Sequence, residues 1–180
     1  MTGIDYGEIS RKVRKTVKKY GSEDPSVLCR RIGIYVLFKD MGTDDTSIKA
    51  VLIRSRRIIS VIVNSNLSSE VMKFIIAHEL GHAVLHAGTE QFTDRIAFNE
   101  VSLMEVEANV FAAELLIPDS DALLEEMKKS EYTVFQLASE YGVPYELMAY
   151  KLDVMRKEGY DVPAVPYEPD SRFLKNIAIV

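Results

Sequence analysis

The segment from Phe74 to His86, FIIAHELGHAVLH, constrains the fold of this chain more than any other stretch. It has the apolar composition of a buried helix, and His78 and His82 are four residues apart within it. On an α-helix this spacing places the two imidazoles about 40° apart around the axis and about 6 Å apart along it. Both rings can then reach one tetrahedral metal ion. The segment therefore predicts a buried helix that carries two ligands of a metal site.

Glu79 follows His78 by about 100° of rotation, so its carboxylate lies off the ligand line on the open side of a bound ion. From there it can take a proton from a water molecule that the metal activates. In a purely structural helix Glu79 would be an unpaired carboxylate in largely buried surroundings, which is costly. All three histidines of the chain also fall between His78 and His86. We therefore interpret Glu79 as a general base beside a metal site.

The composition is that of a globular protein able to build a real core. The 180 residues are 47% hydrophobic and 27% charged, and the net charge of −5 argues against a dedicated nucleic-acid binder. Cys29 is the one cysteine, so an internal disulfide is excluded, and we expect it to be buried as a small apolar side chain. No apolar run approaches the roughly 20 residues of a membrane span, and no signal peptide is visible. We expect a cytoplasmic protein without a membrane partner.

Hydrophobic periodicity and capping residues divide the chain into helices and strands. Helices are expected at 9–20, 25–31, 101–116, about 120–129, 133–141 and 144–157, besides the metal-site helix, which Asn66, Ser68 or Ser69 begins and Ala87–Gly88 ends. Runs of β-branched and aromatic residues predict strands at 34–38, 48–53 and 58–64, the last two joined as a hairpin. We expect a small, mostly antiparallel sheet. Residues 87–100 are expected to form a functional connection beside the site, and the tail is expected to pack back as an extended segment.

Two histidines do not complete a catalytic zinc site, which takes three protein ligands and leaves a fourth position for water. His86 lies about 12 Å along the helix from His78, too far for all three histidines to share one ion, and is expected beside the site or at the surface. Glu105 and Glu107 are the remaining candidates. Because they are two residues apart on a predicted helix, they point in nearly opposite directions. At most one of them can be the ligand.

Two motifs, HELGHxxxH and further downstream ExEANxFAAxLLxP, together resemble those of the ImmA/IrrE metallo-endopeptidases. The pair is far more specific than His-Glu-x-x-His alone. The resemblance implies that His78, His82 and Glu107 hold the metal, since Glu107 is the acidic residue immediately before Ala-Asn, and that Glu79 is the general base. Zinc is the metal expected for such ligands, with manganese or iron as alternatives.

The expected fold class is α+β. The three-stranded sheet would pack on a zincin-like HExxH helix and on a glutamate helix, forming a metallopeptidase core over residues 1–120. A C-terminal extension, residues 121–180, would pack on this core and contain a helix-turn-helix-like pair. Small residues at Ala108 and Ala112 allow the two site helices to approach closely. Asn109 and Glu114 are candidates for orienting a ligating imidazole.

The family resemblance implies hydrolysis of a peptide bond in a protein substrate, typically a helix-turn-helix transcriptional repressor. One alternative is a non-catalytic regulator that binds a repressor, but a purely structural metal site needs no base such as Glu79. Another is a DNA-binding regulator that uses the helical pair at 133–157. The start of its second helix, Pro144 to Glu146, lacks Arg and Lys and places a carboxylate against the phosphates. Direct nucleic-acid binding is therefore not expected.

Overall fold

The computed structural model describes residues 3–44, 46–87, 98–129, 132–165, 169–171 and 173. The secondary-structure elements follow in the order α1 (Tyr6–Tyr20), α2 (Pro25–Ile32), β1 (Ile34–Lys39), β2 (Ala50–Ser55), β3 (Ile58–Asn64), α3 (Ser69–Leu85), α4 (Phe98–Leu116), α5 (Ser120–Lys129), α6 (Val134–Glu140) and α7 (Tyr145–Lys157). The α+β class is confirmed, and the elements lie close to their predicted positions. The predicted connection at 87–100 falls largely outside the described residues, as does the tail beyond Phe173.

The sheet is mixed, so the prediction of a mostly antiparallel sheet is wrong. Its strand order is β1-β3-β2, with β1 parallel and β2 antiparallel to β3. The apolar β3 carries Val61 and Val63, which are fully buried, and it takes the central position where both of its edges are paired. The hairpin between β2 and β3 forms as predicted, with Ser55 paired to Ile58 across the turn. β1 joins the other edge of β3, in parallel, with Ile34 paired to Ile59.

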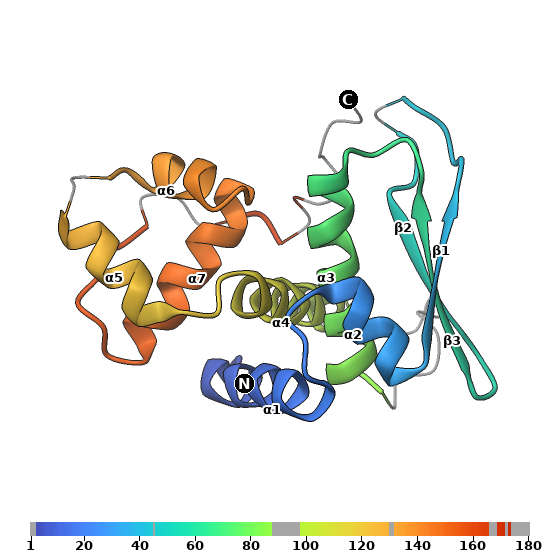
Figure 1. Cartoon of the computed structure of the whole chain (residues 1–180), viewed down its shortest axis with the longest axis horizontal. Helices are drawn as coiled ribbons and strands as arrows, with labels where there is room; N and C mark the ends of the chain where they lie inside the picture. Colours follow the sequence, from blue (N-terminus) through green and yellow to red (C-terminus); the bar gives the residue numbers. More distant parts are fainter. Residues whose placement is uncertain are drawn as a thin grey trace.

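Helix α4 lies at the centre of the molecule (Figure 1). It packs against α3, α1 and α7, while α3 also contacts strands β2 and β3 of the sheet. The sheet therefore stands on one side of α3, and α5, α6 and α7 lie on the other side of the molecule (Figure 1). This arrangement brings the two motifs of the sequence together on adjacent helices at the main hydrophobic core.

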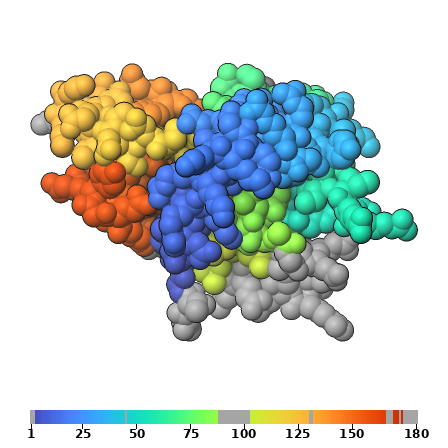
Figure 2. All heavy atoms as spheres, turned by 60° about the horizontal axis from the view of Figure 1, so that its bottom comes forward, coloured from blue at the N-terminus to red at the C-terminus, as the bar shows by residue number. Residues whose placement is uncertain are grey.

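The N-terminal helix and the C-terminal segment both attach to that core. α1 buries Ile9 and Val13 and ends at Gly21, whose φ of 65° is the left-handed conformation that favours glycine. Figure 2 shows α1 on the surface beside parts of α3 and α4. Phe173 is buried in the same core, whereas the rest of the predicted extended tail lies outside the described residues. Within the described ranges, no helix has both the length and the hydrophobicity needed to cross a bilayer.

Candidate metal centre

Helix α3 is held at both ends. Ser68 caps its N-terminus by accepting a hydrogen bond from the backbone N–H of Val71, at 3.3 Å. At the other end, Arg54 of β2 donates a hydrogen bond to the carbonyl oxygen of His82, at 2.9 Å. A cation at this end also interacts favourably with the helix dipole. The hydrogen bond from β2 thereby helps to fix the position of the helix that carries both histidines.

Three side chains converge between α3 and α4: His78, His82 and Glu105. The Nε2 atoms of the two histidines lie 3.0 Å apart. One carboxylate oxygen of Glu105 lies 3.6 Å from Nε2 of His78, and the other lies 3.6 Å from Nε2 of His82. The three side chains are 7%, 6% and 13% exposed. Two buried imidazoles and one largely buried carboxylate therefore form a group.

The spacing of these atoms suits a single ion. Ligands at about 2.0–2.1 Å from a tetrahedral centre are separated from one another by about 3.3 Å. The observed separations of 3.0 Å and 3.6 Å bracket that value. Two imidazole nitrogens and a carboxylate oxygen are also a donor set that divalent transition metals prefer. The residues present therefore fit a divalent metal ion.

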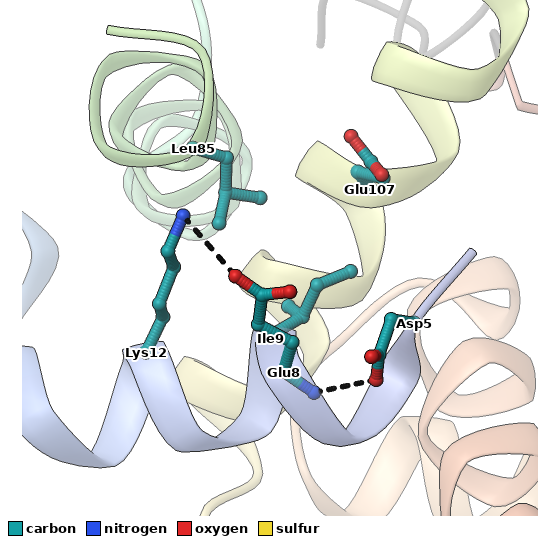
Figure 3. Close-up of a pocket in the computed structure, with 6 residues that line it drawn as sticks. All are labelled: Asp5, Glu8, Ile9, Lys12, Leu85 and Glu107. Atoms are coloured by element: carbon teal, nitrogen blue, oxygen red, sulfur yellow. Dashed lines mark hydrogen bonds and ion pairs between the residues drawn. The ribbon is translucent and has the colours of Figure 1, made fainter. Parts of the chain in front are cut away.

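Glu107 lies outside this group, contrary to the expectation that it would join the histidines. Its Oε2 atom lies 2.9 Å from Nε2 of His86. Its side chain borders a small polar pocket against α1, which Figure 3 shows. The other residues lining that pocket are Asp5, Glu8, Ile9, Lys12 and Leu85. In the structure the carboxylate beside His78 and His82 belongs to Glu105.

The geometry of helix packing explains why Glu105 and Glu107 have exchanged their expected places. α4 packs on α3 through a face that contains Ala108 and Ala112, both fully buried. Residues three and seven positions apart lie on one helix face, so Glu105 shares this face. Glu107 is rotated by about 200° from Glu105 and leaves the helix toward α1 and the end of α3. The two small residues, which the sequence showed, were the signal that could have selected Glu105.

Both histidines of the group are also bonded through their outer nitrogens. Nδ1 of His78 lies 2.8 Å from Oδ1 of Asn109, whose own amide donates to the carbonyl oxygen of Ser171 at 2.8 Å. Asn109 thus orients an imidazole, as expected. Glu114 does not, because it accepts a hydrogen bond from the buried Lys151 ammonium at 2.6 Å. With their Nδ1 atoms bonded in this way, both imidazoles direct Nε2 toward each other and toward Glu105.

Glu79 is partly buried on α3, directly after His78. Its negative charge contributes to the environment of Cys29, which is fully buried as expected. Burial is the main cause that raises the pKa of this thiol to about 12, with smaller contributions from Asp24 and Glu79. Cys29 is therefore a protonated, apolar neighbour of the site and not a nucleophile.

The C-terminal helical pair, α6 and α7, packs into the hydrophobic cores of the protein. Eight of the thirteen residues of α7 are buried, among them Leu147, Tyr150 and Val154, which belong to the main core. α6 and α5 join α7 in a second, smaller hydrophobic cluster. At the surface, the exposed ring of Phe135 stacks on Tyr145 at 4.4 Å between ring centroids. Most of α7 is thus a packing element.

A buried helix that carries His-Glu-x-x-His, completed by a carboxylate from the next helix, has the donor set of a metal-dependent hydrolase. The chain matches the Peptidase M78 family model, described as the IrrE N-terminal-like domain, over residues 29–153, and it belongs to this family. The expected resemblance to ImmA/IrrE metallopeptidases is therefore confirmed.

Two relatives extend the match. The chain is 36% identical over 148 residues to a protein of Bacillus phage phi105 named uncharacterized immunity region protein 2, covering 81% of this chain and 90% of the relative. It is 29% identical over 148 residues to metallopeptidase ImmA of Bacillus subtilis strain 168, covering 80% of this chain and 83% of the relative. The similarity in both cases spans most of both proteins, and together with the family it supports metallopeptidase activity in general.

Proposed function

We propose that this protein is a zinc metallo-endopeptidase that hydrolyses a peptide bond in a protein substrate. The observation that carries the proposal is the largely buried group of His78, His82 and Glu105, with separations that suit one tetrahedral ion. In this assignment Glu105 takes the ligand position that the sequence resemblance had given to Glu107. Zinc is proposed because two imidazoles and a carboxylate are a common ligand set of catalytic zinc.

The ion, when bound, supplies Lewis-acid polarisation of the scissile carbonyl and lowers the pKa of water. Glu79 adds the proton transfers. Its carboxylate takes a proton from the attacking water and returns it to the leaving amine, which otherwise departs as a poor leaving group. The partial burial of Glu79 limits competing hydration of its carboxylate. The outer hydrogen bonds of His78 and His82 hold both rings in place while this happens.

The proposed substrate is a transcriptional repressor of the helix-turn-helix type. The support is the name of the phage relative, which places that protein in an immunity region, and the name of the metallopeptidase relative. Cleavage of a repressor would end the silencing of the genes that it controls. The C-terminal extension, residues 121–180, is proposed to act as part of the peptidase and not as an independent domain, because α7 contributes to the main core.

Substitution of Glu79 by Gln tests the mechanism. Gln preserves the shape of the side chain but cannot accept the proton, so cleavage should fall by about 100- to 10,000-fold while zinc content stays at the wild-type level. The matched control is Glu70→Gln, the same substitution in the exposed first turn of the same helix. Cleavage is followed by mass spectrometry of a candidate repressor incubated with zinc-loaded protein. A Glu79→Gln variant that cleaves as fast as wild type would eliminate the mechanism.

A further inference from the structure

His82 links the proposed metal site to a chain of contacts that continues through His86 and ends at Glu107 of α4. Its Nδ1 atom lies 3.1 Å from Nδ1 of His86. The Nε2 atom of His86 lies 2.9 Å from the carboxylate of Glu107. The His86 side chain is 10% exposed and that of Glu107 is 33% exposed. The chain of contacts thus starts in the protein interior and ends at the polar pocket beside α1 (Figure 3).

The end of helix α3 places His86 where its ring can contact both His82 and Glu107. α3 ends at Leu85, and His86 is its C-cap residue, with φ −111° and ψ 39°. Its backbone N–H still donates to the carbonyl oxygen of His82, at 3.1 Å. The ring of His86 therefore stays one turn beyond His82, with 5.2 Å between the two ring centroids. His86 is too far along the helix to bind the same ion as His78, His82 and Glu105. Its ring instead contacts the outer nitrogen, Nδ1, of His82.

Only one arrangement of protons satisfies all of these contacts when His82 binds a metal. The Nε2 atom of His82 must offer its lone pair, so its Nδ1 atom carries the hydrogen and donates to His86. His86 then accepts at Nδ1 and carries its own hydrogen at Nε2, which donates to the carboxylate of Glu107. A doubly protonated His86 would instead set two N–H groups against each other at the 3.1 Å contact.

We propose that His86 and Glu107 are positioning residues for His82: they fix its metal-binding tautomer and ring orientation and make its Nε2 atom a better donor. This inference rests on the metal site of the proposed function. Ligating histidines that donate their other N–H to a carboxylate or a carbonyl bind metal more tightly, and removal of such a partner typically costs about 10- to 100-fold in affinity. Here the carboxylate acts through a second imidazole.

Zinc affinity, measured by competition with a chromophoric chelator, tests the proposal on the full chain. His86→Phe keeps a flat ring but removes the acceptor for His82, and should weaken zinc binding by about 10- to 100-fold. His86→Gln retains a carbonyl that can accept the Nδ1–H and should recover part of the loss. Glu107→Ala should also weaken binding, by about 10-fold. The visible absorption of cobalt-substituted protein should shift in His86→Phe, because the orientation of a ligand ring has changed.

Glu8→Gln is the matched control, because Glu8 lines the same pocket as Glu107, and it should bind zinc as the wild type does. Glu107→Ala decides the matter if His86→Phe fails to fold, since its side chain is partly exposed. Zinc affinities of both variants within about twofold of wild type would overturn the positioning role, because a loss of about 10-fold or more is expected. The proposed metal site would survive this result if Glu105→Gln abolishes zinc binding in the same assay, because only the positioning role of His86 and Glu107 would then be overturned. A wild-type chain that binds no zinc would overturn both.

Discussion

Gly81 of α3 lies directly against Ala108 of α4. A Cβ atom built on Gly81 would come within 3.1 Å of both the Cα and the carbonyl oxygen of Ala108, and within 3.1 Å of the Cβ atom of Phe111. The two helices therefore approach closely at the point between His78 and His82 on one helix and Glu105 on the other. This close approach allows a glutamate on α4 to reach the histidines of α3.

Replacing Gly81 by Ala should push the two helices apart. Alanine favours a helix interior by about 1 kcal/mol over glycine, but three crowded contacts, two of them to backbone, should cost about 1–3 kcal/mol. We expect a net loss of stability in denaturant unfolding and weaker zinc binding. Gly7→Ala is the control, because its nearest neighbour would be at an ordinary 3.6 Å, and it should be at least as stable as wild type. Unchanged zinc affinity in Gly81→Ala would argue against the close approach as a condition for the site.

The buried ion pair between Lys151 of α7 and Glu114 of α4 should couple the C-terminal helices to the site helix. The ammonium and the carboxylate are 2.6 Å apart and are 0% and 6% exposed. Lys151→Met leaves the Glu114 carboxylate buried without its partner, and should cost about 3–5 kcal/mol in urea unfolding. The double variant Lys151→Met with Glu114→Leu should recover most of that loss. If the single substitution costs less than about 1 kcal/mol, the pair does not hold α7 to α4 in this way.

The thiol of Cys29 should be inert in the native protein. It is fully buried, and burial raises its pKa to about 12, so almost no thiolate exists near neutral pH. A chromogenic disulfide reagent at about pH 8 should therefore react slowly with the folded chain and rapidly in denaturant. Rapid reaction of the folded protein would show that α2 opens easily and that the neighbourhood of Glu79 is exposed to solvent.

Tyr150 should contribute to a loss of stability at alkaline pH. Burial is the main cause that raises the pKa of this phenol from 10.0 to about 12. The folded state thus holds the proton more tightly than the unfolded state, so the contribution is complete below about pH 10 and is lost as the pH rises through about 12. The melting temperature of Tyr150→Phe should fall less steeply over this interval than that of wild type. Equal slopes would contradict the pKa shift.

Much of the fold could be predicted from local pattern. The strand at 58–64, the left-handed stop at Gly21 and the cap at Ser68 follow from residues that are neighbours in sequence, and the structure has each of them. The parallel pairing of β1 with β3 could not be read in this way. It depends on which strand takes the centre of the sheet, and that follows from the burial of Val61 and Val63 against distant helices.

In the candidate site, too, some residues could be predicted from local pattern and others depend on tertiary packing. His78 and His82 are fixed by the four-residue spacing of one helix, so the sequence placed them together before any packing was known. Selecting between Glu105 and Glu107 required the rotation of α4 about its axis. That rotation is set by tertiary contacts, among them the close approach of Gly81 to Ala108. His86 was expected beside the site, but its contact with Glu107 depends on the same rotation.

The location of zinc in crystals of the metal-loaded protein is the most direct test of the central claim. Anomalous diffraction measured on both sides of the zinc absorption edge should give one strong peak, at about 2.0–2.2 Å from Nε2 of His78, Nε2 of His82 and a carboxylate oxygen of Glu105. A peak coordinated by Glu107 or His86, or zinc-loaded crystals with no peak at the three residues, would contradict the account.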